Sequence, residues 1–305
     1  MKFLTLFAAI CMGHLACTQQ VPDTAFKAPI AEPRHLRGQG PVVTLDEAHN
    51  NFHTLAERYK AFGNVLRDDG YVVREGAEPF SERMLATTDV LVIANALSQR
   101  NTRTWTLPCP SAYSTKEIAS VKRWVEQGGS LFLIADHMPF AGATQELGAA
   151  FGFSWLNCYA LDERHRSTEC FFRGGGLEEQ AITSGVLTGL RVDTIVTFTG
   201  SAFQLPAQAQ PILELDSNYT LVEASEAGSF GEDLPRRKAT GWYQGATLEF
   251  GNGRVVVFGE AAMFSAQLAG AQYGPMGFNQ PEASGNITLL RNILAWLTER
   301  SDDQK

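Results

Sequence analysis

The sequence has no concentration of positive charge. Its 305 residues carry 25 Lys and Arg against 33 Asp and Glu, which gives a formal net charge of −8. Proteins that bind nucleic acid by its phosphates need a basic face, and none of the segments supplies one. A nucleic-acid partner is therefore not expected.

Several motifs of common enzyme classes are also missing. There is no GxSxG nucleophile elbow, no GxxxxGK[ST] phosphate loop and no GxGxxG after the first predicted strand. Gly174-Gly175-Gly176 has no strand before it and indicates only a turn. Serine-elbow hydrolases, P-loop NTPases and dinucleotide-binding enzymes are thereby excluded.

No apolar run is long enough to span a membrane as a helix. The longest one near the start, Phe3 to Met12, has about ten residues, whereas a bilayer needs roughly 20. Lys2 before it and Leu15-Ala16-Cys17 after it complete the pattern of a secretory signal peptide over residues 1–17. The last three residues resemble the end of a bacterial lipoprotein box, although His14 stands where a Leu is usual. The sequence predicts a cell-envelope protein, lipid-anchored through Cys17 or periplasmic or secreted, whose only membrane contact is that anchor.

Cysteines are few, and none of them form a CxxC pair, which argues against a zinc ribbon. Outside the signal segment, Cys109, Cys158 and Cys170 remain. An oxidising compartment would allow one disulfide, and Cys158–Cys170 is the first choice because both lie in one loop-like stretch.

Residues 18–40 are rich in Pro and Gly with little periodicity, which predicts a linker. Residues 41–300 then form one domain. Apolar runs at 42–45, 71–73, 90–94 and 130–135 alternate with helical patterns at 50–69, 81–85 and 114–127, and Gly70 and Gly128-Gly129 end two of these helices. Ser114 and Glu117 form a capping box. This alternation predicts a doubly wound, mostly parallel α/β sheet.

The second half is richer in strand patterns. Strands are expected near 194–198, 211–215, 220–222, 246–250 and 254–259, followed by a helix near 286–300. Gly251-Asn252-Gly253 predicts a hairpin turn. A β-rich insertion around residues 160–245 is therefore expected within the domain.

Polar residues follow three of the predicted strands. They are Asp46 with His49 and His53, then Asp136 with His137, then Glu260. Parallel strands place their carboxyl ends at one edge, where ligands of open α/β sheets bind. Asp46, His49, Asp136, His137 and Glu260 are therefore the predicted catalytic residues, with functional atoms within roughly 10 Å of a common centre. His49, His53, Asp136 and His137 are the predicted ligands of a divalent metal such as zinc.

Each of these residues also has a structural interpretation. Asp46 and Asp136 could each cap the helix that follows. His49 and His53, four residues apart, share a face only if one helix includes both. Glu260 at the end of an apolar strand is the hardest to explain without a partner.

The strand order and the paired glycines before Ser130-Leu131-Phe132-Leu133-Ile134 resemble the class I glutamine amidotransferase-like fold, a variant of the flavodoxin-like arrangement. Trehalose-utilisation-type proteins and a domain of gliding-motility transport components share it. The closest likeness is to exported bacterial proteins carrying stretches like 46–53, 135–140 and 259–264. The resemblance implies a nucleophilic cysteine after the fourth strand, but Ala135-Asp136-His137 stands there, so glutaminase chemistry is not expected.

Two functions remain open. The first is an envelope hydrolase, metal-assisted or not, acting on a small-molecule, carbohydrate or peptide substrate. The second is a non-catalytic ligand-binding or scaffold domain that uses the same polar edge.

Overall fold

The computed structural model describes residues 20–164 and 168–299. The helices are α1 (Lys60–Asp68), α2 (Glu82–Leu85), α3 (Thr115–Glu126), α4 (Phe140–Ala149), α5 (Ala181–Ser184) and α6 (Ser284–Thr298), with 3-10 turns η1 (Gln99–Asn101), η2 (Ala262–Phe264) and η3 (Pro281–Ala283). The strands of the first half are β1 (Gln20–Pro22), β2 (Val42–Asp46), β3 (Val72–Gly76), β4 (Val90–Ala94), β5 (Ser130–Ile134), β6 (Ser154–Leu156) and β7 (Tyr159–Asp162). Those of the second half are β8 (Glu169–Arg173), β9 (Gly176–Leu177), β10 (Thr194–Thr197), β11 (Ala202–Gln204), β12 (Gln210–Leu215), β13 (Tyr219–Val222), β14 (Arg236–Lys238), β15 (Trp242–Phe250), β16 (Gly253–Phe258), β17 (Ala266–Ala269) and β18 (Gly274–Gly277).

The main sheet has the order β10-β8-β9-β12-β15-β16-β5-β4-β2-β3, with β11 paired to β15 and β6 paired to β11. Its central strands β16, β5, β4, β2 and β3 are parallel to one another. From β16 onward toward β10, most pairings are antiparallel. The predicted mixed α/β architecture with a parallel central sheet is therefore confirmed.

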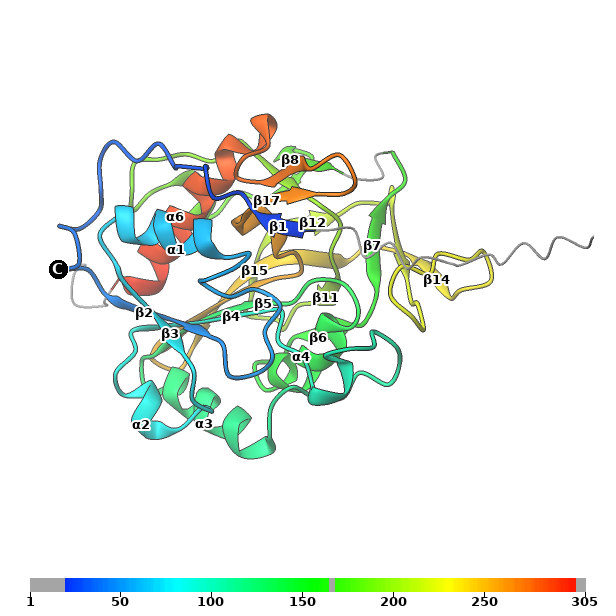
Figure 1. Cartoon of the computed structure of the whole chain (residues 1–305), viewed down its shortest axis with the longest axis horizontal. Coiled ribbons are helices and arrows are strands. Elements are labelled where there is room, and N and C mark those ends of the chain that lie inside the picture. The colour runs from blue at the N-terminus through cyan, green and yellow to red at the C-terminus, as the bar shows by residue number, and fades with distance from the viewer. Residues whose placement is uncertain (1–19, 165–167, 300–305) are drawn as a thin grey trace, which may run out of the picture.

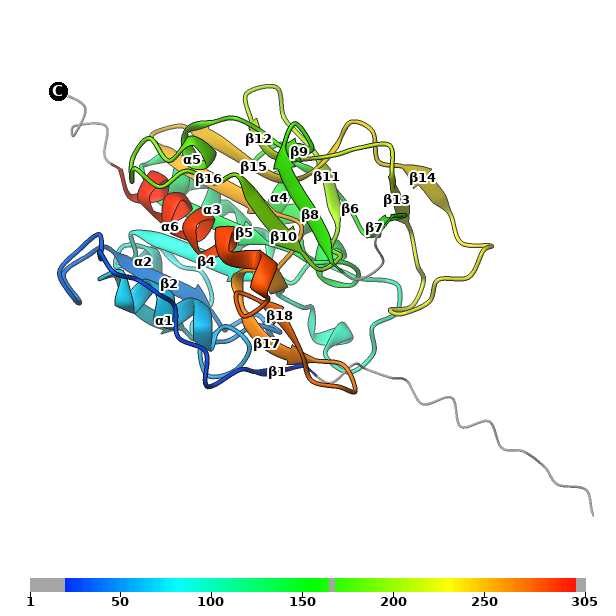
Figure 2. The same ribbon diagram turned by 90° about the horizontal axis from the view of Figure 1, so that it is seen from above.

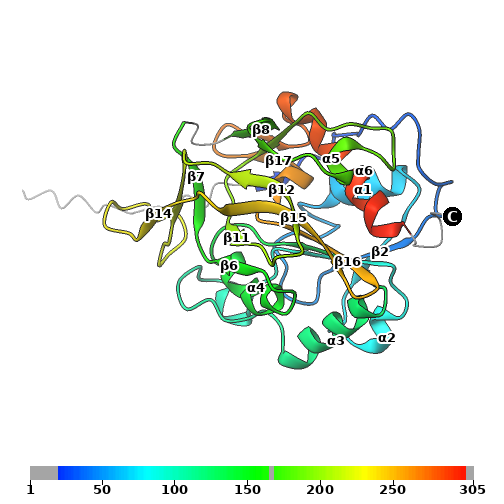
Figure 3. The same ribbon diagram turned by 180° about the vertical axis from the view of Figure 1, so that it is seen from behind.

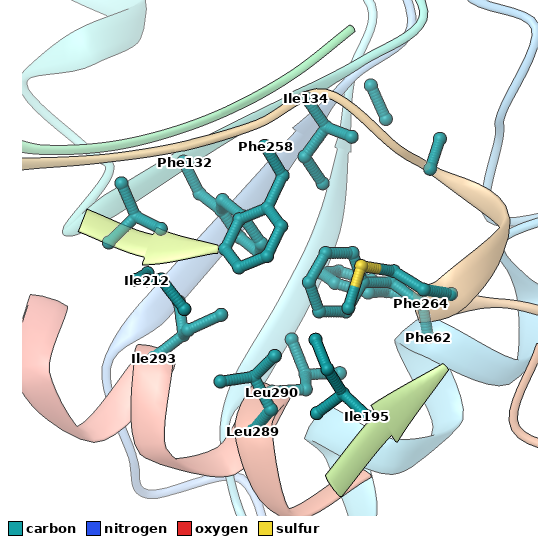
Figure 4. Packing of buried hydrophobic residues seen from close by; sticks show 14 of the residues in the cluster. Phe62, Phe132, Ile134, Ile195, Ile212, Phe258, Phe264, Leu289, Leu290 and Ile293 are labelled. Atoms are coloured by element: carbon teal, nitrogen blue, oxygen red, sulfur yellow. The ribbon is translucent and has the colours of Figure 1, made fainter. Parts of the chain in front are cut away.

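Helices lie on both faces of this sheet (Figure 1), with α1 and α6 on one side and α2 and α3 on the other. Alternate residues of β5 divide between the two faces. Phe132 and Ile134 belong to the core under α1 and α6, whereas Leu131 and Leu133 belong to the core under α3. Figure 4 shows the first core, where Phe132 and Phe258 approach the α6 side chains. Burial on both faces explains why β4 and β5 are uninterrupted apolar runs.

The capping box predicted for α3 forms. The Ser114 side chain accepts from the backbone N–H of Glu117, and the Glu117 side chain accepts from the backbone N–H of Ser114. This reciprocal pair fixes where the helix begins.

The helix predicted over 50–69 begins at Lys60 instead. Asn50 has a left-handed φ of 50°, and the backbone N–H of Phe52 donates to the carbonyl of Asn95. Hydrogen bonds to the segment after β4 replace those of a first helical turn. His49 and His53 therefore lie on a loop and do not share a helix face.

The described part of the predicted linker packs onto the domain. β1 pairs with β17, and Phe26, Ala28 and Ile30 pack against the core of the α1 and α6 face. Phe26 stacks on Phe278 with ring centroids 6.1 Å apart. Composition predicts a linker here because it reports low periodicity, whereas an irregular segment can still bury apolar side chains. The predicted signal peptide lies outside the described residues.

Between β6 and β15 the chain is mostly strand and loop. β7, β13 and β14 form a separate antiparallel sheet, which lies at one end of the molecule (Figure 2). β8 and β10 pair at the far end of the main sheet. Figure 3 shows β11 and β12 with β15 from behind.

The expected disulfide does not form, because Cys109, Cys158 and Cys170 are all free thiols. Cys158 is fully buried in the core, whereas Cys170 lies on the exposed face of β8, where alternate side chains point to opposite sides. The two sulfur atoms are thereby kept apart. Within residues 20–164 and 168–299, none of the helices is long and apolar enough to cross a membrane.

Candidate functional site

The parallel strands β2, β4, β5 and β16 end at the same edge of the sheet, and each end carries a polar residue. Asp46 is the last residue of β2, and Asn95 follows β4 directly. Asp136 and Glu260 each come two residues after the end of β5 and β16. The predicted acids are thus placed at one edge, and Asn95 joins them although the sequence pattern did not single it out.

Asp46 and His49 form a group with Glu117 of α3. His49 Nδ1 lies 2.8 Å from Asp46 Oδ1, and His49 Nε2 lies 2.9 Å from Glu117 Oε1. A neutral imidazole has only one N–H, whereas both carboxylates here accept from the ring, so the geometry requires an imidazolium. The ring packs against Phe80 and Tyr113. Glu117 is a partner that sequence reasoning missed, because it recognised only its capping role.

The remaining carboxylate bonds of this group are also made. Asp46 Oδ2 accepts from Asn51 Nδ2, and Asp46 Oδ1 from the backbone N–H of Ala48. Burial alone would lower the pKa of His49, but the hydrogen bonds and charges of Asp46 and Glu117 raise it above its ordinary value. Burial alone would raise the pKa of Glu117, but its bonds from Ser114 and His49 lower it to about 2. The group is a charged and fully hydrogen-bonded network.

Asp136 and Glu260 form a second group. Glu260 is fully buried, and its carboxyl oxygens accept the backbone N–H groups of Ala262 and Met263 at 2.8 and 2.7 Å. Burial, and then the negative charge of Asp136, raise the pKa of Glu260 well above its ordinary value. Glu260 is therefore protonated at neutral pH, beside a second carboxyl group.

His53 lies on the inner side of the same loop. It is 2% exposed, its ring packs 4.5 Å from that of Tyr59, and neither ring nitrogen has a hydrogen-bond partner. Burial, with the charge of Arg58, lowers its pKa to about 3. Tyr59 donates a hydrogen bond to the carbonyl of Ala261, next to Glu260. His53 is thus a neutral histidine in an apolar and aromatic environment.

His137 is the partly exposed member of the predicted set. Its Nδ1 lies 2.7 Å from the carbonyl oxygen of Met138. Because a carbonyl only accepts, Nδ1 carries the proton, and in the neutral ring Nε2 carries the lone pair. The ring stacks on Tyr159 with centroids 4.3 Å apart, and Trp105 lies 6.4 Å away. A tautomer fixed in this way suits a general base.

A further buried acid, Glu169, was not found from the sequence. It is 2% exposed on β8 and accepts a hydrogen bond from Thr197 Oγ1 at 2.9 Å. Burial raises its pKa to about 8, and the charges of Asp162 and Asp136 act in the same direction. Glu169 also contributes to the raised pKa of Glu260. Its strand begins with an acid among alternating residues, a pattern that by itself indicates an exposed side chain.

The residues predicted to bind a metal are not brought together as one site. His49 has both ring nitrogens on carboxylates, while His53 faces Phe52 and Tyr59 instead. In the part of the chain that the structure describes, no group of three or more His, Cys, Asp or Glu is arranged to hold a metal ion. The four residues separate because the predicted helix over 50–69 does not include His49 and His53.

Comparison with known proteins places the fold. No protein-family model matches the chain, and none of the curated protein sequences gives a significant match. Among solved structures, the N-terminal domain of mmIFT52 superposes with a TM-score of 0.57 at 14% identity, over 85% of this chain and 98% of that one. A ThuA-like protein from Bacteroides uniformis gives a TM-score of 0.50 at 12% identity, over 89% of this chain and 95% of that one. The chain has a class I amidotransferase-like fold.

A GMP synthase protein from Thermoplasma acidophilum is also similar, with a TM-score of 0.42 at 10% identity over 85% of this chain and 96% of that one. At these identities the likeness concerns the fold alone. In the amidotransferase-like fold of this chain, Asp136 and His137 follow β5 at the place where the resemblance implies a cysteine. Function must therefore be argued from these residues.

Proposed function

We propose that this protein is an exported hydrolase of the bacterial cell envelope, with its active site at the carboxyl edge of the parallel strands. The observation that carries the proposal is His137, whose Nδ1 is held by the Met138 carbonyl at 2.7 Å while the ring remains partly exposed. A small-molecule, carbohydrate or peptide substrate would bind at this edge.

His137 would act as the general base. Nε2 takes a proton from water as the water oxygen forms a bond to the electrophilic carbon of the substrate. The bond to the leaving group then breaks, and the proton on Nε2 passes to that group. Asp136 Oδ1 accepts the backbone N–H of His137 at 2.7 Å and so fixes the start of the histidine segment. The protonated Glu260 provides a neutral acid close to the Asp136 charge.

Asp46 and His49 support this site from a distance in our proposal, since their hydrogen-bonding groups are occupied within the network with Glu117. A divalent metal, predicted from His49, His53, Asp136 and His137, stays a hypothesis. Elemental analysis of the protein purified without residues 1–17 tests it.

A second candidate is a non-catalytic ligand-binding or scaffold domain. It is favoured by the burial of Asp46 and Glu260, both 0% exposed, with the oxygens of each carboxyl hydrogen-bonded. A polar edge that satisfies its own groups can serve stability alone.

The hydrolase is tested with the protein lacking residues 1–17 and a panel of p-nitrophenyl esters, p-nitrophenyl glycosides and fluorogenic peptides. Turnover of at least one class is expected, and His137→Gln should abolish it. His35→Gln is the matched control, because the His35 ring packs against Tyr71 in another part of the fold. Activity that survives His137→Gln, or no turnover of any class, would favour the scaffold function.

Export through a lipid anchor is a separate part of the proposal. It rests on Leu15-Ala16-Cys17 after a short apolar run. Cys17→Ser should abolish radiolabelled-lipid incorporation and detergent-phase partitioning. A wild-type protein that never incorporates lipid would contradict the anchor. The finer description of residues 41–300 as one doubly wound domain with a β-rich insertion at 160–245 belongs to the same proposal.

A further inference from the structure

A continuous chain of hydrogen bonds begins at the surface, at Ser114. Its Oγ lies 2.7 Å from Glu117 Oε2, and the other oxygen of that carboxylate accepts from His49 Nε2 at 2.9 Å. His49 Nδ1 donates to Asp46 Oδ1 at 2.8 Å. Ser114 is exposed and Asp46 is fully buried, so the chain leads from the start of α3 into the end of β2.

The chain continues from Asp46 toward the segment after β4. Asn51 Nδ2 donates both to Asp46 Oδ2 at 3.0 Å and to the carbonyl of Ala94 at 3.2 Å. The backbone N–H of Phe52 donates to the carbonyl of Asn95 at 2.9 Å. The loop after β2 is thereby fastened to Asn95 and its neighbour.

Asn95 completes the connection to the candidate catalytic residues. Its Oδ1 accepts the backbone N–H of Asp136 at 2.9 Å, and its own N–H donates to the carbonyl of Ile134. Asn95 holds a left-handed φ of 49°, a conformation that costs energy and persists only when its surroundings impose it. The bend that presents Asp136 and His137 is therefore held from Asn95.

We propose that Glu117 is a positioning residue, which holds the segment of Asp136 and His137 in place through His49, Asp46, Asn51 and Asn95. Its chemical consequence rests on the proposed hydrolase function, whereas the connection itself rests on the contacts. An imidazolium between two carboxylates is a strong and directional link in a buried site. Replacing one carboxylate weakens that link and frees the loop that supports Asn95.

The test uses nitrogen-detected NMR of the histidine rings in the protein lacking residues 1–17. In the wild type, His49 should show two protonated ring nitrogens, and His137 should show a protonated Nδ1. Glu117→Gln should change the His49 signals and also shift those of His137, which Glu117 does not contact. The matched control is Glu126→Gln, the same change at an exposed position of the same helix. Signals of His137 identical in Glu117→Gln and Glu126→Gln would overturn the proposal.

Two further variants separate the chain from other effects. Ser114→Ala removes the helix cap but keeps the contact between Glu117 and His49, so it should leave the His137 signals in place. A shift equal to that of Glu117→Gln would assign the effect to the cap and overturn the proposal. Asn95→Gly removes the acceptor for Asp136 and tolerates the left-handed φ. It should shift the His137 signals and leave both His49 nitrogens protonated.

If an activity is found, Glu117→Gln should lower kcat by about tenfold with KM unchanged, because the substrate contacts remain while the base is displaced. A change confined to KM would contradict a positioning role. The NMR result decides the connection whether or not a substrate is known.

Discussion

Asp136 and Glu260 stand at the same offset beyond two paired residues of adjacent parallel strands. Ile134 of β5 is in register with Phe258 of β16, and each carboxyl follows its strand residue by two positions. Equal offsets on neighbouring parallel strands place both side chains at one edge of the sheet and close to each other. This proximity, added to burial, explains the raised pKa of Glu260.

Replacing His49 by Gln should destabilise the protein. The buried Asp46 and Glu117 would lose the cation between them, at a cost of about 3–5 kcal/mol. Because the folded pKa of His49 is raised, its stabilising contribution is complete below the unfolded pKa of about 6.5 and is lost as the pH rises through the folded pKa. Urea unfolding of both proteins at several pH values should show the largest difference near pH 6. An equal difference at all pH values would contradict the charged bridge.

Replacing Glu169 by Gln should reduce the pH dependence of stability. Its pKa is raised to about 8 in the folded protein, so the folded state holds a proton that the unfolded chain releases near pH 4.5. Stability therefore falls between about pH 4.5 and 8, by up to about 1.4 kcal/mol per pH unit for this group. Thermal unfolding across this range should show a smaller decline in the variant. Glu249→Gln, at an exposed position of β15, should leave the decline unchanged.

Thiol counting should find three reactive cysteines in denatured, unreduced protein that lacks residues 1–17. The structure keeps Cys109, Cys158 and Cys170 as free thiols. In the native protein the exposed Cys170 should react first and the buried Cys158 last, because a reagent must reach the sulfur. A count of one would restore the disulfide that the compartment argument predicts.

Replacing Phe26 by Ala should lower the free energy of unfolding by about 1 kcal/mol, since the half-buried ring would lose its contact with Phe278. The measurement is a denaturant curve on protein that begins at residue 18. Leu36→Ala is the control in the same segment, because Leu36 is 71% exposed. Equal stability of the Phe26 variant and the control would show that this segment acts as a linker.

Local patterns determined the elements that the sequence predicted well. The apolar runs of β4 and β5 indicate strands buried on both faces, and Ser114 with Glu117 specifies the start of α3. From parallel strands alone, Asp46, Asp136 and Glu260 are expected at one edge, and the strand pairings place them there. These features follow from spacing within a few residues, which the sequence displays directly.

Tertiary structure alone decided the partners of those residues. Glu117 reaches His49 across 68 positions, and Glu169 lies near Asp136 although β8 is a separate strand far along the chain. The turn conformation of residues 50–59 also depends on Asn95, more than forty positions away, which replaces the helix that local periodicity favours. Sequence patterns report which face of an element is buried. The protonation of Glu260 and His49 depends on which charges the packing brings beside them, because electrostatic interactions act through space and are strongest where water is excluded.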